Sequence, residues 1–190
     1  MVKVAFLVEG KVEKKLIDYL VSEDWFSQFN IEQAGPVIDV KGGGSLCPHN
    51  MQAFVEQAIA HNPDKILILT DLECDPCVTK TKERLGNCPI CSIVLARKAI
   101  EAWFLADDEV VKYFTDNKLQ SFEYPEDTDG MPYDKLKEIA LEHTGRGVGL
   151  KILCANKILK RIGFKIENAA NHPNCHSAKY FIDKVKSIGE

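Results

Sequence analysis

Three carboxylates in this sequence have the spacing of ligands for a hard cation. Glu9 follows the apolar run 2–8, and Asp71 follows the apolar run 65–70. Glu73 comes two residues after Asp71, so in an extended segment the two side chains would point to one side. Clustered carboxylates stay ionised most readily around a divalent cation, and Mg²⁺ prefers such oxygen ligands. The pattern predicts Mg²⁺ or Mn²⁺ at these residues. The alternative is that Glu9 is a helix-start residue and that Asp71 and Glu73 form a solvated loop.

The elements that would position these carboxylates alternate between strand and helix. Strands are expected at 2–8, 36–40, 65–70 and 92–96, and helices at 11–21, 51–60 and from about 98 to 113. This alternation predicts an α/β fold with a mostly parallel, four-stranded sheet flanked by helices. Ligands of such sheets bind beyond the carboxyl ends of the strands, where Glu9 and Asp71 are expected.

The composition changes beyond Asp116. The segment 123–132 is acidic and rich in turn residues, and helical spacing follows near 133–143, 150–162 and 177–188. We therefore expect an α/β core over 1–116, with a cysteine-rich insertion at 74–91, and a linker with a helical subdomain over 117–190.

Charge and hydropathy limit the partners. The formal net charge of −4 gives no general attraction for nucleic acid, so contact with phosphate would need a local basic patch or bound cations. The first apolar run is too short for a signal peptide or a membrane span, because charged residues follow it at once. A cytoplasmic location without membrane contact is the expectation.

Four of the seven cysteines form two closely spaced pairs, Cys74 with Cys77 and Cys88 with Cys91. Each two-residue gap lets both sulfurs reach one tetrahedral ion, so the quartet predicts a structural Zn²⁺ site. Reduced thiols or a disulfide are the alternatives.

A glycine run and two cations are candidates for phosphate binding. Backbone N–H groups of Gly42, Gly43 and Gly44 lie between an expected strand and an expected helix, as in anion-binding loops. Arg97 and Lys98 could neutralise a nucleic-acid backbone. A flexible turn and a solvated charged face are the alternatives.

Four segments resemble a known family. FLVEGKVEKKLIDYL resembles the first Toprim motif, and ILTDLE resembles the second, with Glu73 in place of its second aspartate. ARKAIEAWFLAD and HPNCHSAKYF are similar to segments of small Toprim-like proteins related to the overcoming-lysogenization-defect nucleases. The resemblance implies a Toprim-like, Rossmann-like fold in which Glu9, Asp71 and Glu73 are catalytic and hold the divalent cation. It implies further that Glu101 is an auxiliary acid, whereas pairing with Arg97 or Lys98 would make Glu101 purely structural.

Two functions follow as expectations. The first is a Mg²⁺-dependent nuclease or phosphodiesterase acting on DNA or RNA, in phage defence or repair if the resemblance extends to biological role. The second is a non-catalytic module that binds nucleic acid or a nucleotide and is stabilised by zinc. A partner protein or a homodimer is left open as a source of specificity.

Overall fold

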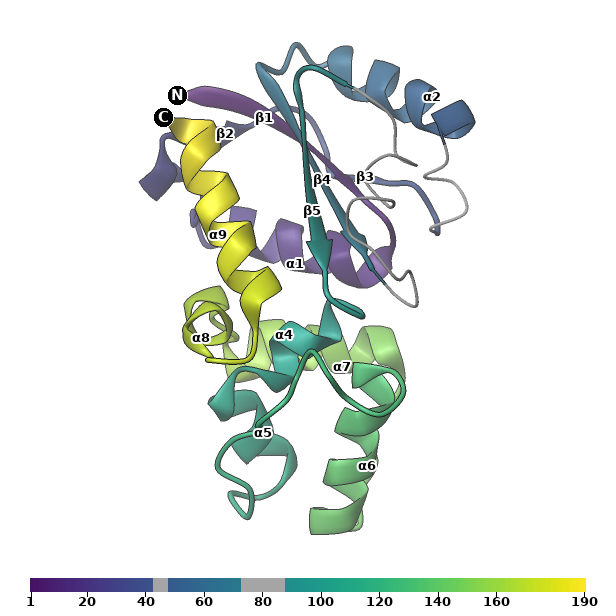
Figure 1. Ribbon diagram of the computed structural model, residues 1–190, viewed down its shortest axis with the longest axis vertical. Helices are drawn as coiled ribbons and strands as arrows, with labels where there is room; N and C mark the ends of the chain where they lie inside the picture. The colour runs from purple at the N-terminus through teal and green to yellow at the C-terminus, as the bar shows by residue number, and fades with distance from the viewer. Residues whose placement is uncertain (43–47, 73–87) are drawn as a thin grey trace. The chain divides into compact units, whose positions relative to one another are not determined.

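The computed structural model describes residues 1–42, 48–72 and 88–190 (Figure 1). The chain divides into two compact units. Unit 1 comprises Met1–Leu95 and Asp183–Glu190, and unit 2 comprises Ala96–Ile182. No helix within the described ranges is long and apolar enough to cross a membrane.

The described part of unit 1 is built on a five-stranded sheet (Figure 1). Strand β1 (Val2–Val8) pairs in parallel with β2 (Ile31–Gln33), β3 (Ile38–Asp39) and β4 (Lys65–Asp71). The order of the main path is β2-β1-β4-β5, with β5 (Cys91–Ala96) next to β4. The expectation of an α/β fold with a mostly parallel sheet is confirmed, and the arrangement is consistent with a Rossmann-like fold.

The expected count of four strands is wrong, because two short strands pair with the same side of β1. β2 pairs with the start of β1 and β3 with its end. Between them Gly35 has a φ of +74°, and a Cβ there would lie 2.3 Å from Cγ of His61. The sequence of β2 contains a glutamate and a glutamine, so the strand gives no apolar run to recognise.

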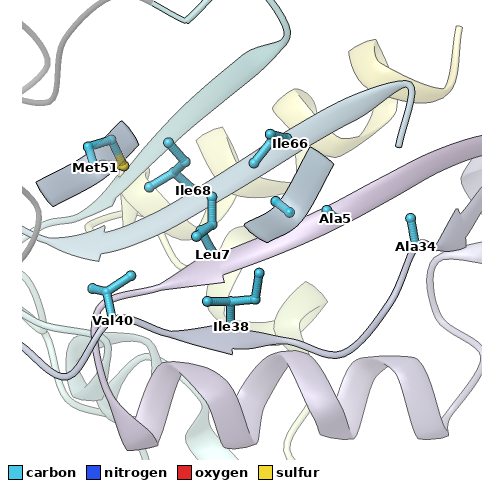
Figure 2. Packing of buried hydrophobic residues seen from close by; sticks show 9 residues of the cluster. Ala5, Leu7, Ala34, Ile38, Val40, Met51, Ile66 and Ile68 are labelled. Atoms are coloured by element: carbon cyan, nitrogen blue, oxygen red, sulfur yellow. The ribbon is translucent and has the colours of Figure 1, made fainter. Parts of the chain in front are cut away.

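Both faces of the sheet are covered. Figure 2 shows the cluster on one face, where side chains of β1, β3 and β4 meet Met51 of α2 (Pro48–Ile59). Phe6 alternates with Ala5 and Leu7 along β1 and so points to the opposite face. There its ring packs against that of Phe26, tilted by 43° and with the centroids 4.8 Å apart. Burial on both faces explains why β1 and β4 read as nearly continuous apolar runs.

The described part of unit 1 also contains two more helices and one short turn. Helix α1 (Lys11–Ser22) follows β1 and packs against it, and η1 (Ser27–Phe29) leads into β2. Helix α9 (His176–Gly189) begins in unit 2 and ends in unit 1.

Unit 2 is helical. It contains α4 (Glu101–Leu105), α5 (Asp108–Phe114), α6 (Pro132–Thr144), α7 (Lys151–Lys157), the π-helix η3 (Ile158–Ile162) and α8 (Ile166–Asn171). Helix α4 packs against α5, α6 and α8. Residues 96–116 therefore belong to the helical unit 2, whereas an α/β core over 1–116 was expected from the sequence.

The single helix expected from about 98 to 113 is interrupted at Asp107. The backbone of Asp107 is extended, and its Oδ1 accepts a hydrogen bond from the Glu109 N–H at 3.1 Å, which caps α5. The same buried carboxylate accepts from the Lys165 N–H at 3.1 Å and from the Asn168 side chain at 3.0 Å. Asp107 therefore ends one helix, starts the next and ties both to α8.

Candidate functional site

The carboxylate of Glu9 lies where β1 and β4 end side by side. The strands pair with Val8 opposite Leu69, and the Glu9 N–H donates to the Leu69 carbonyl oxygen at 3.1 Å. Oε2 of Glu9 accepts a hydrogen bond from the Thr70 hydroxyl and another, at 2.9 Å, from the Asp71 N–H. The residue is only 8% exposed, so the neighbouring strand holds a nearly buried carboxylate in one position.

Asp71 is the last residue of β4 and is half-buried. The structure thus brings its backbone into direct contact with Glu9, at the sheet edge where strand order placed both residues. Glu73, the third predicted ligand, lies outside the described residues. Asp39 ends β3 at the same edge, and its Oδ1 accepts from the Lys41 N–H at 2.7 Å.

Glu13 is a buried carboxylate near Glu9 that was not among the predicted site residues. It lies in the first turn of α1 and is 5% exposed. A Cβ placed on Gly10 would lie 3.1 Å from Oε2 of Glu13, so this carboxylate sits over the residue that follows Glu9. The signal in the sequence was an acid four residues after Glu9, at a helix start where negative charge is favourable. The glycine at position 10 leaves room for it.

The side chains of Glu9, Asp71 and Glu13 match the ligand preference of Mg²⁺ or Mn²⁺, because each could offer carboxylate oxygens as metal ligands. Within the described ranges, no three His, Cys, Asp or Glu side chains converge closely enough to form a complete metal site. Glu9 and Asp71 would supply part of a coordination shell. Mg²⁺ commonly completes such a shell with water and substrate phosphate oxygens.

The predicted phosphate-binding groups are occupied by contacts within the protein where they are described. The Gly42 N–H donates to the Glu9 carbonyl oxygen at 2.8 Å, while Gly43 and Gly44 lie outside the described residues. Arg97 forms a 2.6 Å ion pair with Asp127. Lys98 donates from Nζ to the Gly130 carbonyl oxygen at 3.2 Å. Phosphate binding by these groups stays a prediction.

Glu101 lies in unit 2, on α4, and is 2% exposed. Its partner is neither Arg97 nor Lys98 but Lys151, whose Nζ lies 2.9 Å from Oε1. No donor in the described part of the chain reaches Oε2. Burial raises the pKa of the Glu101 carboxyl above its ordinary value, and the Lys151 ammonium opposes that shift. A buried carboxyl with one unsatisfied oxygen is the kind of group found at ligand sites.

The cysteines that are described do not form a zinc site. Cys88 and Cys91 are joined by a disulfide, one of the alternatives left open for this pair. Cys74 and Cys77 lie outside the described residues, so zinc binding by all four stays a prediction and would require reduction of the disulfide. Cys154 and Cys175 are buried and reduced, and burial raises the pKa of the Cys154 thiol to about 11.

A buried polar network connects segments of unit 2 that are far apart in sequence. The Ser177 hydroxyl accepts from Trp103 Nε1 at 2.7 Å and from the Arg97 N–H at 3.1 Å, and it donates to the Glu126 carboxylate. The Ser177 and His176 N–H groups, at the start of α9, also donate to Glu126, at 2.8 and 3.0 Å. Glu126 belongs to the segment predicted as a linker, yet it is 1% exposed and caps a helix.

Comparisons with protein-family models, with curated proteins and with solved structures gave no match to this chain.

Proposed function

We propose that the protein is a divalent-metal-dependent phosphodiesterase that acts on nucleic acid, with its reactive centre at the shared end of β1 and β4. The observation that carries the proposal is the Glu9 carboxylate, which is buried and fixed by the Thr70 hydroxyl and the Asp71 N–H. A carboxylate held in one position beside another acid, at the carboxyl ends of two parallel strands, is well placed to bind a divalent cation. The resemblance of these two segments to Toprim motifs supports the same proposal.

The residues have separate roles in this proposal. Glu9 and Asp71 hold Mg²⁺ or Mn²⁺, with Glu73 as a further ligand, and Glu13 adds negative charge beside Glu9. A bound cation of this kind polarises a phosphodiester and lowers the pKa of a water molecule. Thr70 positions Glu9, because its hydroxyl fixes Oε2 toward β4. For Glu101, which lies in unit 2, the role of an auxiliary acid stays what the resemblance implies, and burial raises the pKa of its carboxyl.

The test is cleavage of labelled DNA and RNA by the purified protein in Mg²⁺ or Mn²⁺. Asp71→Asn removes one charge while keeping the size of the side chain, so we expect the rate to fall by at least about a hundredfold. Asp18→Asn, a charge-matched change at an exposed residue of α1, should leave the rate unchanged. Nucleic-acid binding without any cleavage by the wild-type protein would instead support the non-catalytic module.

A further inference from the structure

One stretch of unit 2 has a charge opposite to that of the chain as a whole. The segment 143–166 contains six Lys or Arg residues and no Asp or Glu, in a chain with a formal net charge of −4. It covers the end of α6, the loop that follows, α7 and η3. A local concentration of cations in an acidic protein marks a surface for an anionic partner.

The π-helix η3 presents two of these cations to solvent. Its first residues, Ile158 and Leu159, are buried, whereas Lys160 and Arg161 are exposed. Within the described chain, neither cation has a carboxylate at ion-pair distance. π-Helical turns are rare and occur frequently at functional sites. The local fold therefore anchors the apolar side of η3 and leaves its charges available.

Two aromatic rings of α5 lie beside cations of this segment, one under Arg161 and one under Lys157. Cζ of Arg161 is 5.9 Å from the centre of the Tyr113 ring, and Nζ of Lys157 is 5.7 Å from that of Phe114. Tyr113 is 39% exposed, which is high for a large aromatic side chain. The Phe114 ring is buried, so Tyr113 is the ring available for stacking. A cation beside an exposed aromatic ring is a combination that binds single-stranded nucleic acid, through a phosphate and a stacked base respectively.

A cavity of about 360 Å³ opens beside these rings. Its lining includes Tyr113, Phe114, Lys157 and Arg146, all from unit 2. The one carboxylate of the lining, Asp116, forms an ion pair with Arg146. The cavity has the size of a small-ligand site and combines rings with positive charge, as a nucleotide requires.

We infer that this basic face, defined as Tyr113, Arg146, Lys157, Lys160 and Arg161, binds single-stranded nucleic acid. The cations contact successive phosphates, and one base lies against Tyr113 in the cavity. The inference deepens the proposed function and rests on it for the choice of nucleic acid as the ligand. An anionic membrane surface is the competing partner for a basic face, but binding to lipid headgroups would leave the ring-lined cavity unfilled.

Binding is measured by fluorescence anisotropy of labelled oligo-dT and oligo-U in EDTA, so that no cleavage occurs. We expect Lys160→Gln with Arg161→Gln to weaken binding about tenfold. The slope of log K against the logarithm of the salt concentration should also become shallower by about 1.4, since each phosphate contact with a single strand contributes about 0.7. Lys179→Gln with Lys184→Gln, two residues of α9, changes the charge equally and should have little effect. Lys160→Arg with Arg161→Lys should retain binding.

Three outcomes would overturn the inference. The first is that the double variant at 160 and 161 and the control double variant at 179 and 184 weaken binding equally. The second is that Lys160→Gln with Arg161→Gln retains full affinity. The third is that the protein binds phosphatidylserine vesicles but not oligonucleotides. The proposed function is tested separately, because Asp71→Asn should abolish cleavage while leaving the affinity for oligonucleotides in EDTA intact. A protein that binds through the basic face but never cleaves would refute the phosphodiesterase and leave the basic face standing.

Discussion

Glu9 and Glu101, two of the buried carboxylates, are stabilised in different ways. Glu9 accepts hydrogen bonds from Thr70 and Asp71, both on the adjacent strand. The Glu101 carboxylate pairs at Oε1 with the ammonium of Lys151, and Lys151 itself is substantially exposed. Water screens an exposed charge, so the ion pair compensates the burial of Glu101 only in part. Glu101 is therefore the group whose ionisation should work against folding.

The Glu101→Gln variant tests this directly through the pH dependence of stability. Because the pKa of Glu101 in the folded protein is raised above its ordinary value of 4.5, the folded state binds the proton more tightly than the unfolded state. The stability contributed by this group is complete below pH 4.5 and is lost as the pH rises through the folded-state pKa. Glutamine cannot ionise, so the variant should gain stability relative to wild type between about pH 4 and pH 8, by about 1 kcal/mol.

Urea denaturation at the two pH values measures the effect. Glu138→Gln is the control, since Glu138 pairs with Lys135 on the exposed side of α6 and should show no such gain. An identical difference between Glu101→Gln and wild type at both pH values would contradict the prediction.

Parts of the candidate site could be predicted from the sequence, because they depend on local order. Glu9 directly follows one apolar strand and Asp71 ends another. Parallel pairing brings the carboxyl ends of these strands together at one edge of the sheet. The partner of Glu101 could not be predicted in the same way. Lys151 lies on another helix, and only the packing of unit 2 brings its side chain to α4.

At the scale of elements, α9 is fixed at its start by contacts from three other segments. Glu126 caps its first N–H groups, and the Ser177 hydroxyl collects donors from Trp103 and Arg97. Composition indicated a linker at 123–132, because acidic and turn-forming residues are usually exposed. The burial of Glu126 is a tertiary effect, since its partners come from α9, about fifty residues later.

Ser177→Ala should destabilise the protein by about 2–4 kcal/mol. The substitution leaves the indole N–H of Trp103 and the backbone N–H of Arg97 without their acceptor in a buried setting, at about 1–3 kcal/mol for each such group. Ser187→Ala makes the same change on the same helix, where the hydroxyl is exposed and bonds only to the Lys184 carbonyl oxygen, so it should be nearly neutral. Chemical denaturation of the two variants gives the comparison, and equal losses would refute the role of the network.

At the scale of the whole molecule, the chain leaves unit 1 after Leu95 and returns to it at Asp183. The returning end of α9 lies against η1. A Cβ on Gly189 would lie 1.7 Å from the Phe29 carbonyl oxygen, and Asn30 donates to the Gly189 carbonyl oxygen at 3.3 Å. Sequence patterns could not reveal this division, because periodicity describes each helix separately and says nothing about which unit its ends join.

Gly189→Ala should lower the melting temperature by about 5 °C. Alanine favours helix, but its methyl group would collide with the Phe29 backbone, and overpacking of this kind costs about 1–3 kcal/mol. Gly147→Ala is the matched control, since a Cβ there meets nothing within 4 Å. Differential scanning calorimetry measures the melting temperatures of both variants. A melting temperature for Gly189→Ala equal to or above that of the control would show that the contact is dispensable.

The return of α9 to unit 1 also has a consequence for biosynthesis. The strands β1 to β5 leave the ribosome first, but the contacts of η1, Asn30 and Ile31 with Gly189 can form only after all of unit 2 has been translated. At about 5–20 residues per second, the sheet waits roughly five to twenty seconds for its last helix. During that interval the nascent sheet lacks the cover that α9 later gives to η1 and β2, so this protein should depend on chaperones more than a chain whose units are contiguous.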